Sequence, residues 1–299
     1  MSEISAGRGR SRIALGAAQF GMAYGIANQA GQLSEAEGAA TLQLARQAGI
    51  DTIDTAIAYG TSEERLGDQG MAGWRVVSKL PSMSAAHGDV SAWVQASIEG
   101  SLRRLRVPSL YGLLLHRPED LLGDDGPRLY RELRDLKARG AVAKIGVSVY
   151  EPQELEPIVT RFAIDLVQAP FNVFDRRLQT SGWATRLSDL GVELHTRSAF
   201  LQGLLLARPD RRPDYFSRWA ALWAKWDGWL ADTSQSPLHV CLGHVLSEPL
   251  VQRVVVGVDG VRQLSEILQL ADCPLLTTPP VELSTDDPDL LHPFRWSSP

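Results

Sequence analysis

Short apolar runs recur along the whole chain, and each is apolar at successive positions rather than at alternating ones. Eight such runs lie at residues 13–16, 50–54, 76–79, 113–116, 145–148, 166–168, 192–195 and 254–257. Strands that are buried on both faces have this pattern, because neither face meets solvent. The pattern therefore predicts eight central strands of a parallel sheet.

Stretches with the apolar spacing of amphipathic helices separate the predicted strands. One begins after Ser34, with Glu37 three residues later as a capping box and an apolar face at residues 42–48. Others cover residues 93–105 and 129–136. Eight strand–helix units in roughly 250 residues match a (β/α)8 TIM barrel. No Gly-x-Gly-x-x-Gly motif follows the first strand, which argues against a doubly wound dinucleotide-binding sheet.

No linker-like segment divides the chain, so we expect a single (β/α)8 domain over residues 1–299. The polar residues 1–10 are expected to be a flexible N-terminus. Residues 272–299, rich in Pro, Ser, Thr and Asp, are expected to be an irregular C-terminal tail that wraps the surface.

Four tryptophans follow the seventh predicted strand at helical spacings, namely Trp219, Trp223, Trp226 and Trp229. The spacing predicts a helix that packs one aromatic face onto the barrel. The alternative is a lid that faces the substrate.

Composition and charge narrow the possible functions. The 299 residues are 44% hydrophobic with a net charge of −5, which is ordinary for a globular protein and argues against nucleic acid as the main partner. Cys241 and Cys273 cannot form a disulfide framework, and this favours a reducing compartment. The apolar runs are far shorter than the roughly 20 residues that cross a bilayer, and no signal peptide is evident. We therefore expect a cytoplasmic protein without a membrane partner, and a monomer, because no amphipathic stripe is left over.

Chemistry in a (β/α)8 barrel lies where the strands end. The polar residues that close the second to seventh runs are Asp54, Lys79, His116, Ser148, Gln168 and Arg197. Taken singly, such residues often have structural roles, as helix caps, buried histidines or packing. A lysine at the barrel mouth is different, because a buried ammonium needs a carboxylate beside it. Asp54, on the neighbouring strand, can supply that carboxylate.

Tyr59, five residues after Asp54, completes a proton-transfer group. A free tyrosine has a pKa of about 10 and is a weak acid at neutral pH. We expect the Lys79 cation to lower the pKa of Tyr59, and Asp54 to keep Lys79 charged and oriented. His116 can hydrogen-bond a substrate carbonyl. No protein side chain donates hydride, so such a site requires a cofactor.

These residues resemble the aldo-keto reductase superfamily. The stretch GIDTIDTAIAYGTSEERLG at residues 49–67 is similar to the signature that carries the family's catalytic Asp and Tyr. Further similar segments are VSK at 77–79, LLH at 114–116, KIGVS at 144–148, QAPFN at 168–172, and Gly257 with Gln263-Leu264. The resemblance covers residues 11–270. It implies NAD(P)H-dependent reduction of an aldehyde or ketone, or the reverse oxidation.

The resemblance also implies roles for individual residues. Tyr59 is the general acid, Lys79 and Asp54 tune it, and His116 positions the carbonyl. Ser148 and Gln168 hydrogen-bond the nicotinamide carboxamide, and Arg197 replaces a tyrosine that stacks on the nicotinamide ring, as a guanidinium plane can. The remaining cofactor contacts that it implies are Ser198, Phe200, Gln202, Gly203, Gly257, Val258, Asp259 and Gln263.

The sequence departs from the family pattern at the cofactor contacts. Val149 stands where the family usually has an Asn, and Ile267 stands where an Asn usually holds the adenine. Asp259 would repel a 2′-phosphate, and Arg262 could pair with one. NAD(H) and NADP(H) therefore both remain candidate cofactors, and the substrate class is a small carbonyl or sugar-like molecule.

Two other functions stay open from the sequence. The altered cofactor contacts are compatible with an NAD(H)-binding regulatory protein that has no turnover. A metal-dependent hydrolase using His116, Asp54 and Glu63 lacks clustered ligands, so no metal is expected. Phe20, Tyr150 and Trp183 are candidates for lining the substrate pocket or for packing.

Overall fold

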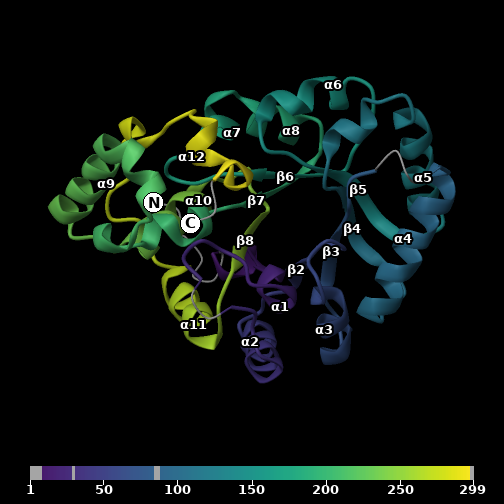
Figure 1. Cartoon of the computed structure of the whole chain (residues 1–299), viewed down its shortest axis with the longest axis horizontal. Helices are drawn as coiled ribbons and strands as arrows, with labels where there is room; N and C mark the ends of the chain where they lie inside the picture. The colour runs from purple at the N-terminus through teal and green to yellow at the C-terminus, as the bar shows by residue number, and fades with distance from the viewer. Residues whose placement is uncertain (1–8, 29–30, 84–87, 297–299) are drawn as a thin grey trace, which may run out of the picture.

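The computed structural model describes residues 9–28, 31–83 and 88–296, and its eight strands form one closed barrel (Figure 1). Every neighbouring pair is parallel, and β1 pairs with both β2 and β8, which closes the sheet. The predicted (β/α)8 barrel is therefore confirmed. The strands are β1 Ile13–Gly16, β2 Thr52–Asp54, β3 Arg75–Leu80, β4 Leu110–Leu115, β5 Val142–Ser148, β6 Leu166–Pro170, β7 Glu193–Arg197 and β8 Arg253–Gly257.

Helices surround the strands on the outside of the barrel (Figure 1). They are α1 Ala18–Gly21, α2 Glu35–Gln47, α3 Ser62–Gln69, α4 Val90–Leu105, α5 Gly126–Ala138, α6 Leu155–Val159, α7 Arg177–Thr180, α8 Trp183–Asp189, α9 Ala220–Thr233, α10 Pro237–Ser247, α11 Val261–Leu270 and α12 Pro288–Leu291. In the part of the chain that the structure describes, no helix combines the length and apolarity needed to cross a membrane.

The N-terminus of α2 differs from the predicted capping box. Ser34 Oγ accepts a hydrogen bond from the Glu37 N–H at 3.2 Å, which is one half of the motif. The Glu37 carboxylate does not complete the other half. It accepts instead from the N–H of Val261, the first residue of α11, at 2.8 Å. A side chain in the first turn of α2 thus accepts a hydrogen bond from the N-terminus of another helix.

Apolar side chains fill two different spaces around the strands. The larger core lies between the strands and the surrounding helices, and includes Ile53 and Val167, which are fully buried. A smaller cluster, formed by Val77, Leu114 and Leu166, fills the inside of the barrel. Because side chains alternate along a strand, Asp54 and Gln168, next to Ile53 and Val167, point into the barrel instead.

The Trp-rich segment forms α9, as predicted, but it packs on the end of the chain and on loops rather than directly on the barrel. Trp223 and Trp226 are buried in a separate cluster with Phe174, Leu290 and Leu291. No tryptophan of this segment is among the described residues that line the large cavity considered below, so the lid alternative has no support.

The tail is less irregular than expected. Residues 1–8 and 297–299 lie outside the described residues, but Arg10 begins a short 3-10 turn, Arg10–Arg12. Between residues 272 and 296 the chain forms the short α12, at whose start Asp287 accepts a hydrogen bond from the Asp289 N–H at 2.9 Å. Two adjacent leucines of α12 are buried, which explains why this polar segment has a fixed path.

A polar cluster closes the amino-terminal end of the barrel, and we call it the floor cluster: Tyr111, Lys144, Glu193 and His195. The Glu193 carboxylate accepts from Tyr111 Oη at 2.6 Å, lies 2.7 Å from His195 Nε2, and forms an ion pair with Lys144. Hydrogen bonds from these three partners outweigh burial and hold the pKa of Glu193 well below its usual value.

Glu193→Gln should lower the free energy of unfolding by about 2 kcal/mol at pH 7, because it removes charge-assisted hydrogen bonds in a half-buried cluster. The pKa of Glu193 is lower in the folded protein than in the unfolded chain, where it is about 4.3. Its carboxylate therefore stabilises the fold fully at pH values above about 4.3. This stabilisation is lost as the pH falls from there through the pKa of the folded state. The difference between wild type and variant in chemical denaturation should therefore shrink below pH 4. A difference that stays constant between pH 7 and pH 3 would contradict this account.

Candidate active site

Parallel pairing brings the strand ends to one level at the carboxyl end of the barrel. Asp54 pairs with Gly16 and Val77, and Ser148 pairs with Gln168. The residues that close the apolar runs therefore meet around one mouth, as expected for this fold.

A buried ion pair lies at the centre of the mouth. Lys79 Nζ is 2.6 Å from Asp54 Oδ1, and the two side chains are 1% and 6% exposed. Lys79 Nζ also donates to the Thr55 carbonyl oxygen at 2.8 Å. Burial lowers the pKa of Lys79, and the charge of Asp54 and its hydrogen bond to Lys79 oppose that effect. The predicted carboxylate partner of Lys79 is thus present.

Ser148 and Gln168 extend this pair into a chain of hydrogen bonds. Gln168 Nε2 donates to Asp54 Oδ2 at 2.7 Å, and Ser148 Oγ donates to Gln168 Oε1 at 3.4 Å. Both side chains are buried. They were expected to hold a nicotinamide carboxamide. In the protein itself they orient Asp54, and through it Lys79.

Tyr59 is placed by a close approach of two backbone segments. A Cβ on Gly21 would lie 1.8 Å from the Tyr59 carbonyl oxygen, and a Cβ on Gly60, at φ +55°, would lie 2.4 Å from the Gly21 carbonyl oxygen. Ser62 Oγ donates to the Ala17 carbonyl oxygen at 2.8 Å and ties the same loop to the end of β1. Only glycine fits at positions 21 and 60, so the loop can hold Tyr59 against the mouth.

Three side chains surround the Tyr59 ring. Lys79 Nζ is 5.2 Å from the ring centroid, the His116 ring lies edge-on at 5.9 Å between centroids, and the Tyr24 ring lies at 6.4 Å. The structure therefore brings together all four predicted catalytic residues, Asp54, Tyr59, Lys79 and His116. Tyr24 was not anticipated, because an isolated aromatic in a loop gives no signal in the sequence.

The pKa of Tyr59 shifts in the opposite direction to the one expected. Burial raises it well above its ordinary value, the charge of Asp54 adds to the rise, and Arg197 opposes it. The expectation of a lowered pKa in the protein as it stands is therefore wrong, because removal from water outweighs the neighbouring cations. Burial, together with the cations Lys79 and Arg197, also lowers the pKa of His116 to about 4. At neutral pH, Tyr59 keeps its proton and His116 is neutral.

A cavity of about 380 Å³ runs from this group over β8 to the start of α11. Among the predicted site residues, its walls include Asp54, Tyr59, Gln168, Arg197, Ser198, Phe200, Gln202, Gly203, Gly257, Asp259 and Gln263. Lys79, His116 and Ser148 lie behind or beside these walls through the contacts described above. Val258 is buried in the hydrophobic core, with 1% exposure, and is not among the lining residues described.

Two loops meet over the cavity. A Cβ on Gly203 would lie 2.7 Å from Ala27 Cβ, and Gln202 Nε2 lies 3.3 Å from Tyr24 Oη. Gln202, although not a glycine, has φ +54°, in the left-handed region. The loop after β1 and the turn after β7 thus cover part of the cavity.

Arg197 is held from several sides. Its Nη2 donates to the Val149 carbonyl oxygen at 3.0 Å, and its Cζ lies 4.3 Å from the centroid of the Tyr150 ring. Asn172 Nδ2 donates to the Ser198 carbonyl oxygen at 3.1 Å and fixes the next residue. Tyr150 therefore packs on Arg197, whereas Phe20 and Trp183, the other aromatic candidates, are core residues.

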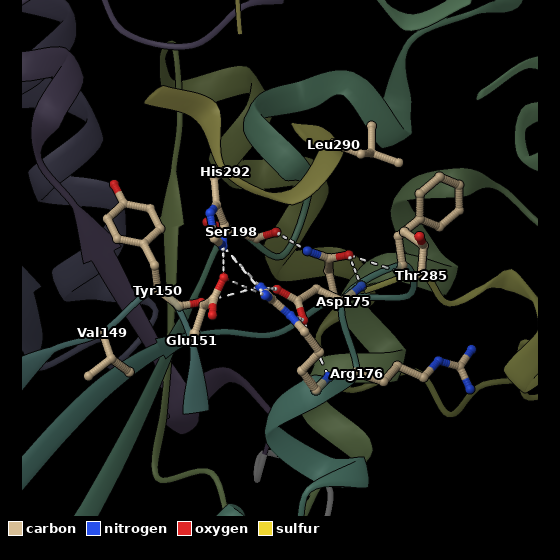
Figure 2. Close-up of polar contacts among 12 residues, drawn as sticks. Val149, Tyr150, Glu151, Asp175, Arg176, Ser198, Thr285, Leu290 and His292 are labelled. Carbon is tan, nitrogen blue, oxygen red and sulfur yellow. Dashed lines mark hydrogen bonds and ion pairs between the residues drawn. The ribbon is translucent and has the colours of Figure 1, made fainter. Parts of the chain in front are cut away.

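The C-terminal tail reaches this region through His292 (Figure 2). Arg177 pairs with Asp175, 2.8 Å away, and both of its terminal nitrogens lie 3.4 Å from His292 Nε2. A guanidinium only donates, so Nε2 can accept from Arg177 when the His292 ring is neutral, and Glu151 Oε1 lies 3.5 Å from the same nitrogen. Consistently, burial and Arg177 lower the pKa of His292 to about 4. The His292 and Phe294 rings pack on Tyr150 at 5.4 and 4.8 Å between centroids.

His292→Leu should release the tail, because it removes the contact of the tail with the buried Arg177 guanidinium and the ring that packs on Tyr150. We expect limited proteolysis at pH 7 to cut within residues 284–296 about tenfold faster than in wild type, since cleavage follows the population of the open form. His239→Leu, on α10, is the matched control. Equal cleavage rates in the two variants would contradict a role of His292 in holding the tail.

Three comparisons with known proteins agree with this geometry. The model of the aldo/keto reductase family matches residues 12–279. This chain belongs to the aldo/keto reductase family. The family and the barrel make it an oxidoreductase of carbonyl compounds, and members of the family generally use NAD(P)H. The resemblance of residues 11–270 to this superfamily is thereby confirmed.

Named relatives are distant. An uncharacterised oxidoreductase of Bacillus subtilis, YqkF, is 23% identical over 269 residues, covering 79% of this chain and 82% of the relative. Among solved structures, the aldo-keto reductase AKR11C1 of Bacillus halodurans has a TM-score of 0.71 at 19% identity, covering 89% of this chain and 88% of that one. The glycerol dehydrogenase AKR11B4 of Gluconobacter oxydans has a TM-score of 0.67 at 23% identity, covering 88% and 87%. At such identities the two structures support the fold alone.

The described residues hold no group of three or more His, Cys, Asp and Glu side chains that could bind a metal ion. Glu63, which the hydrolase alternative requires, is fully engaged elsewhere. Its carboxylate accepts from Ser78 and Ser101, at 2.7 and 2.6 Å, and from Arg104.

Proposed function

We propose that this protein reduces an aldehyde or ketone to an alcohol, or runs the reverse oxidation, with NADH or NADPH as hydride donor and Tyr59 as general acid. The observation that carries the proposal is the meeting of Tyr59, His116 and the buried Lys79–Asp54 pair beside a cavity of about 380 Å³. A bound nicotinamide dinucleotide supplies the hydride that no side chain can supply.

The cavity has the chemistry that a dinucleotide needs. Amide and guanidinium donors of Gln168, Arg197 and Gln202 lie among apolar walls, and the covering loops limit access from solvent. Arg197, with its guanidinium packed on Tyr150, offers a flat cationic surface for the nicotinamide ring. Gln168 and Ser148 offer an amide and a hydroxyl to the carboxamide next to it.

Tyr59 protonates the carbonyl oxygen as hydride reaches the carbon. Its raised pKa keeps the phenol protonated at neutral pH, so the acid is in the required form before reaction. As the proton leaves, negative charge develops on the phenol oxygen. The Lys79 and Arg197 cations favour that charge more in the transition state than in the ground state, which is the condition for catalysis.

His116 orients the substrate. A neutral imidazole has one N–H to donate, and the His116 ring lies edge-on to Tyr59 at 5.9 Å between centroids. A carbonyl oxygen can therefore receive one hydrogen bond from His116 and the proton from Tyr59. Positioning of this kind raises the rate by holding reactants in a near-attack geometry.

The test is a pair of measurements on the intact chain. The first is the loss of dihydronicotinamide absorbance with NADH and with NADPH against an aryl aldehyde, a short aliphatic aldehyde and an aldose. Because one structural neighbour is named a glycerol dehydrogenase, the panel includes oxidation of glycerol. The second is dinucleotide binding by calorimetry. Binding without turnover on the panel would favour a regulatory NAD(H)-binding protein, and absence of binding would reject the proposal.

A further inference from the structure

Arg197 lies in the cavity wall without a carboxylate to hold it. Its side chain lines the cavity at the end of β7, together with Tyr59 and Gln168. Its Nη2 donates to the Val149 carbonyl oxygen at 3.0 Å, and its Nη1 donates to Ser198 Oγ at 3.3 Å. Among the residues that the structure describes, no Asp or Glu forms an ion pair with it. Neutral oxygens therefore supply its polar contacts.

An aromatic ring lies against the guanidinium of Arg197. Its Cζ is 4.3 Å from the centroid of the Tyr150 ring. A guanidinium plane stacks on an aromatic face, and the ring attracts the cation without neutralising it. A carboxylate in the same place would also hold the side chain, but it would cancel the charge. The Tyr150 ring therefore restrains Arg197 and leaves its charge available at the cavity.

Tyr150 is itself held through its backbone and its ring. Its N–H donates to Glu154 Oε2 at 3.3 Å, and its carbonyl oxygen accepts from Arg177 Nη2, at the start of α7, at 3.2 Å. The His292 ring of the C-terminal tail packs edge-on against the Tyr150 ring (Figure 2), and the Phe294 ring does the same. Three segments of the chain, namely the loop after β5, α7 and the tail, thus fix the ring that restrains Arg197.

The position of Arg197 bears on both binding and proton transfer. Burial and the charge of Asp54 raise the pKa of Tyr59, and the Arg197 cation opposes them. Because Coulomb energy depends on distance, a displaced guanidinium would stabilise the developing phenolate less. A guanidinium that is free to move also loses conformational freedom when a ligand orders it, and a ring that holds it beforehand removes part of that cost.

We propose that Tyr150 is a positioning residue for the reaction, whose ring holds the Arg197 guanidinium in place at the cavity wall. The inference rests on the proposed function, in which Arg197 faces the nicotinamide ring. Tyr150 is not among the described residues that line the cavity. It therefore acts through Arg197 and not by its own contact with a ligand.

The experiment measures the dissociation constants of NADH and NADPH by calorimetry, without a carbonyl substrate, and kcat separately. The variants are Tyr150→Phe, which keeps the ring, Tyr150→Leu, which removes it, Arg197→Met, and the double variant Tyr150→Leu/Arg197→Met. Tyr130→Leu is the matched control, because Tyr130 is another half-buried tyrosine and lies on α5, outside the barrel. A thermal melt of each variant checks that it is folded.

Tyr150→Leu should weaken binding of the dinucleotide that wild type prefers about fivefold and lower kcat about tenfold, which is the range of a cation–π contact. Tyr150→Phe should restore most of both values. In the double variant, loss of the ring should add less than about twofold to the effect of Arg197→Met, since a positioning residue has no effect once its target is gone. Tyr130→Leu should change neither value.

Two results would overturn the inference while leaving the proposed function in place. One is an effect of Tyr150→Leu on binding that is equally large with and without Arg197, as loss of packing alone produces. The other is an Arg197→Met variant that binds both dinucleotides as tightly as wild type. Failure of both dinucleotides to bind wild type would instead reject the proposed function, and the inference with it.

Discussion

Tyr59→Phe should lower kcat for carbonyl reduction about a thousandfold, in the range that general acid catalysis contributes, and leave dinucleotide binding unchanged. The substitution removes one hydroxyl and keeps the ring that packs beside Lys79 and His116. Without the phenol proton, the developing alkoxide has no acid at the required place. Water is a poor replacement, because a water molecule is not held at the position that the Tyr59 hydroxyl occupies between Lys79 and His116.

The matched control is Tyr24→Phe, which removes a hydroxyl from the neighbouring ring, 6.4 Å away between centroids. The pKa of Tyr24 is also raised, to about 12, mainly by the loss of solvent around its hydroxyl, so proton affinity does not separate the two phenols. Only the position of Tyr59 does. Steady-state kinetics and calorimetry on both variants check the prediction, and near-normal kcat in Tyr59→Phe would remove Tyr59 from the mechanism.

Lys79→Met should destabilise the fold by about 3–5 kcal/mol and also abolish most turnover. The substitution leaves the Asp54 carboxylate buried with its cation removed, and breaking a buried ion pair from one side is costly for that reason. Gln168 still donates to Asp54, so part of the carboxylate stays satisfied. Chemical denaturation measures the loss.

The double variant Lys79→Met/Asp54→Asn separates the ion pair from simple packing loss. Removing the second charge should restore about 2 kcal/mol, because the unpaired carboxylate causes much of the damage, while turnover stays low. If the double variant is less stable than Lys79→Met alone, the destabilisation comes from lost packing of the lysine stem, and the account of Asp54 as an otherwise unpaired charge is wrong.

The barrel and the meeting of four site residues could be predicted from the sequence, because both follow from the order of apolar and polar residues within short segments of the chain. Doubly buried strands are continuous apolar runs, and the residue closing each run lies at the mouth of any parallel barrel. Asp54, Lys79 and His116 were found in this way, and Tyr59 by its distance from Asp54 along one loop. The assignment of individual roles to these residues stays a prediction.

The contacts that could not be predicted join distant parts of the chain. Arg177 meets His292 across 115 positions, and Glu37 meets Val261 across 224. Glu37 shows the difficulty well, since its spacing from Ser34 indicates a local capping box and only tertiary packing redirects its carboxylate. The pKa of Tyr59 was misjudged for a related reason. The sequence shows which charged residues lie near Tyr59. It does not show the loss of solvent around Tyr59, which raises the pKa more than the neighbouring cations lower it.

The barrel contains two buried ionic groups, one at each end of its axis, separated by the apolar side chains of Val77, Leu114 and Leu166. Among the described residues, no hydrogen bond or ion pair joins the floor cluster to Lys79 or Asp54 across this layer. The barrel therefore has one ionic group at the mouth, where the chemistry is proposed, and a second at the far end, so changes to the loops around the mouth can alter substrate choice without touching the floor cluster.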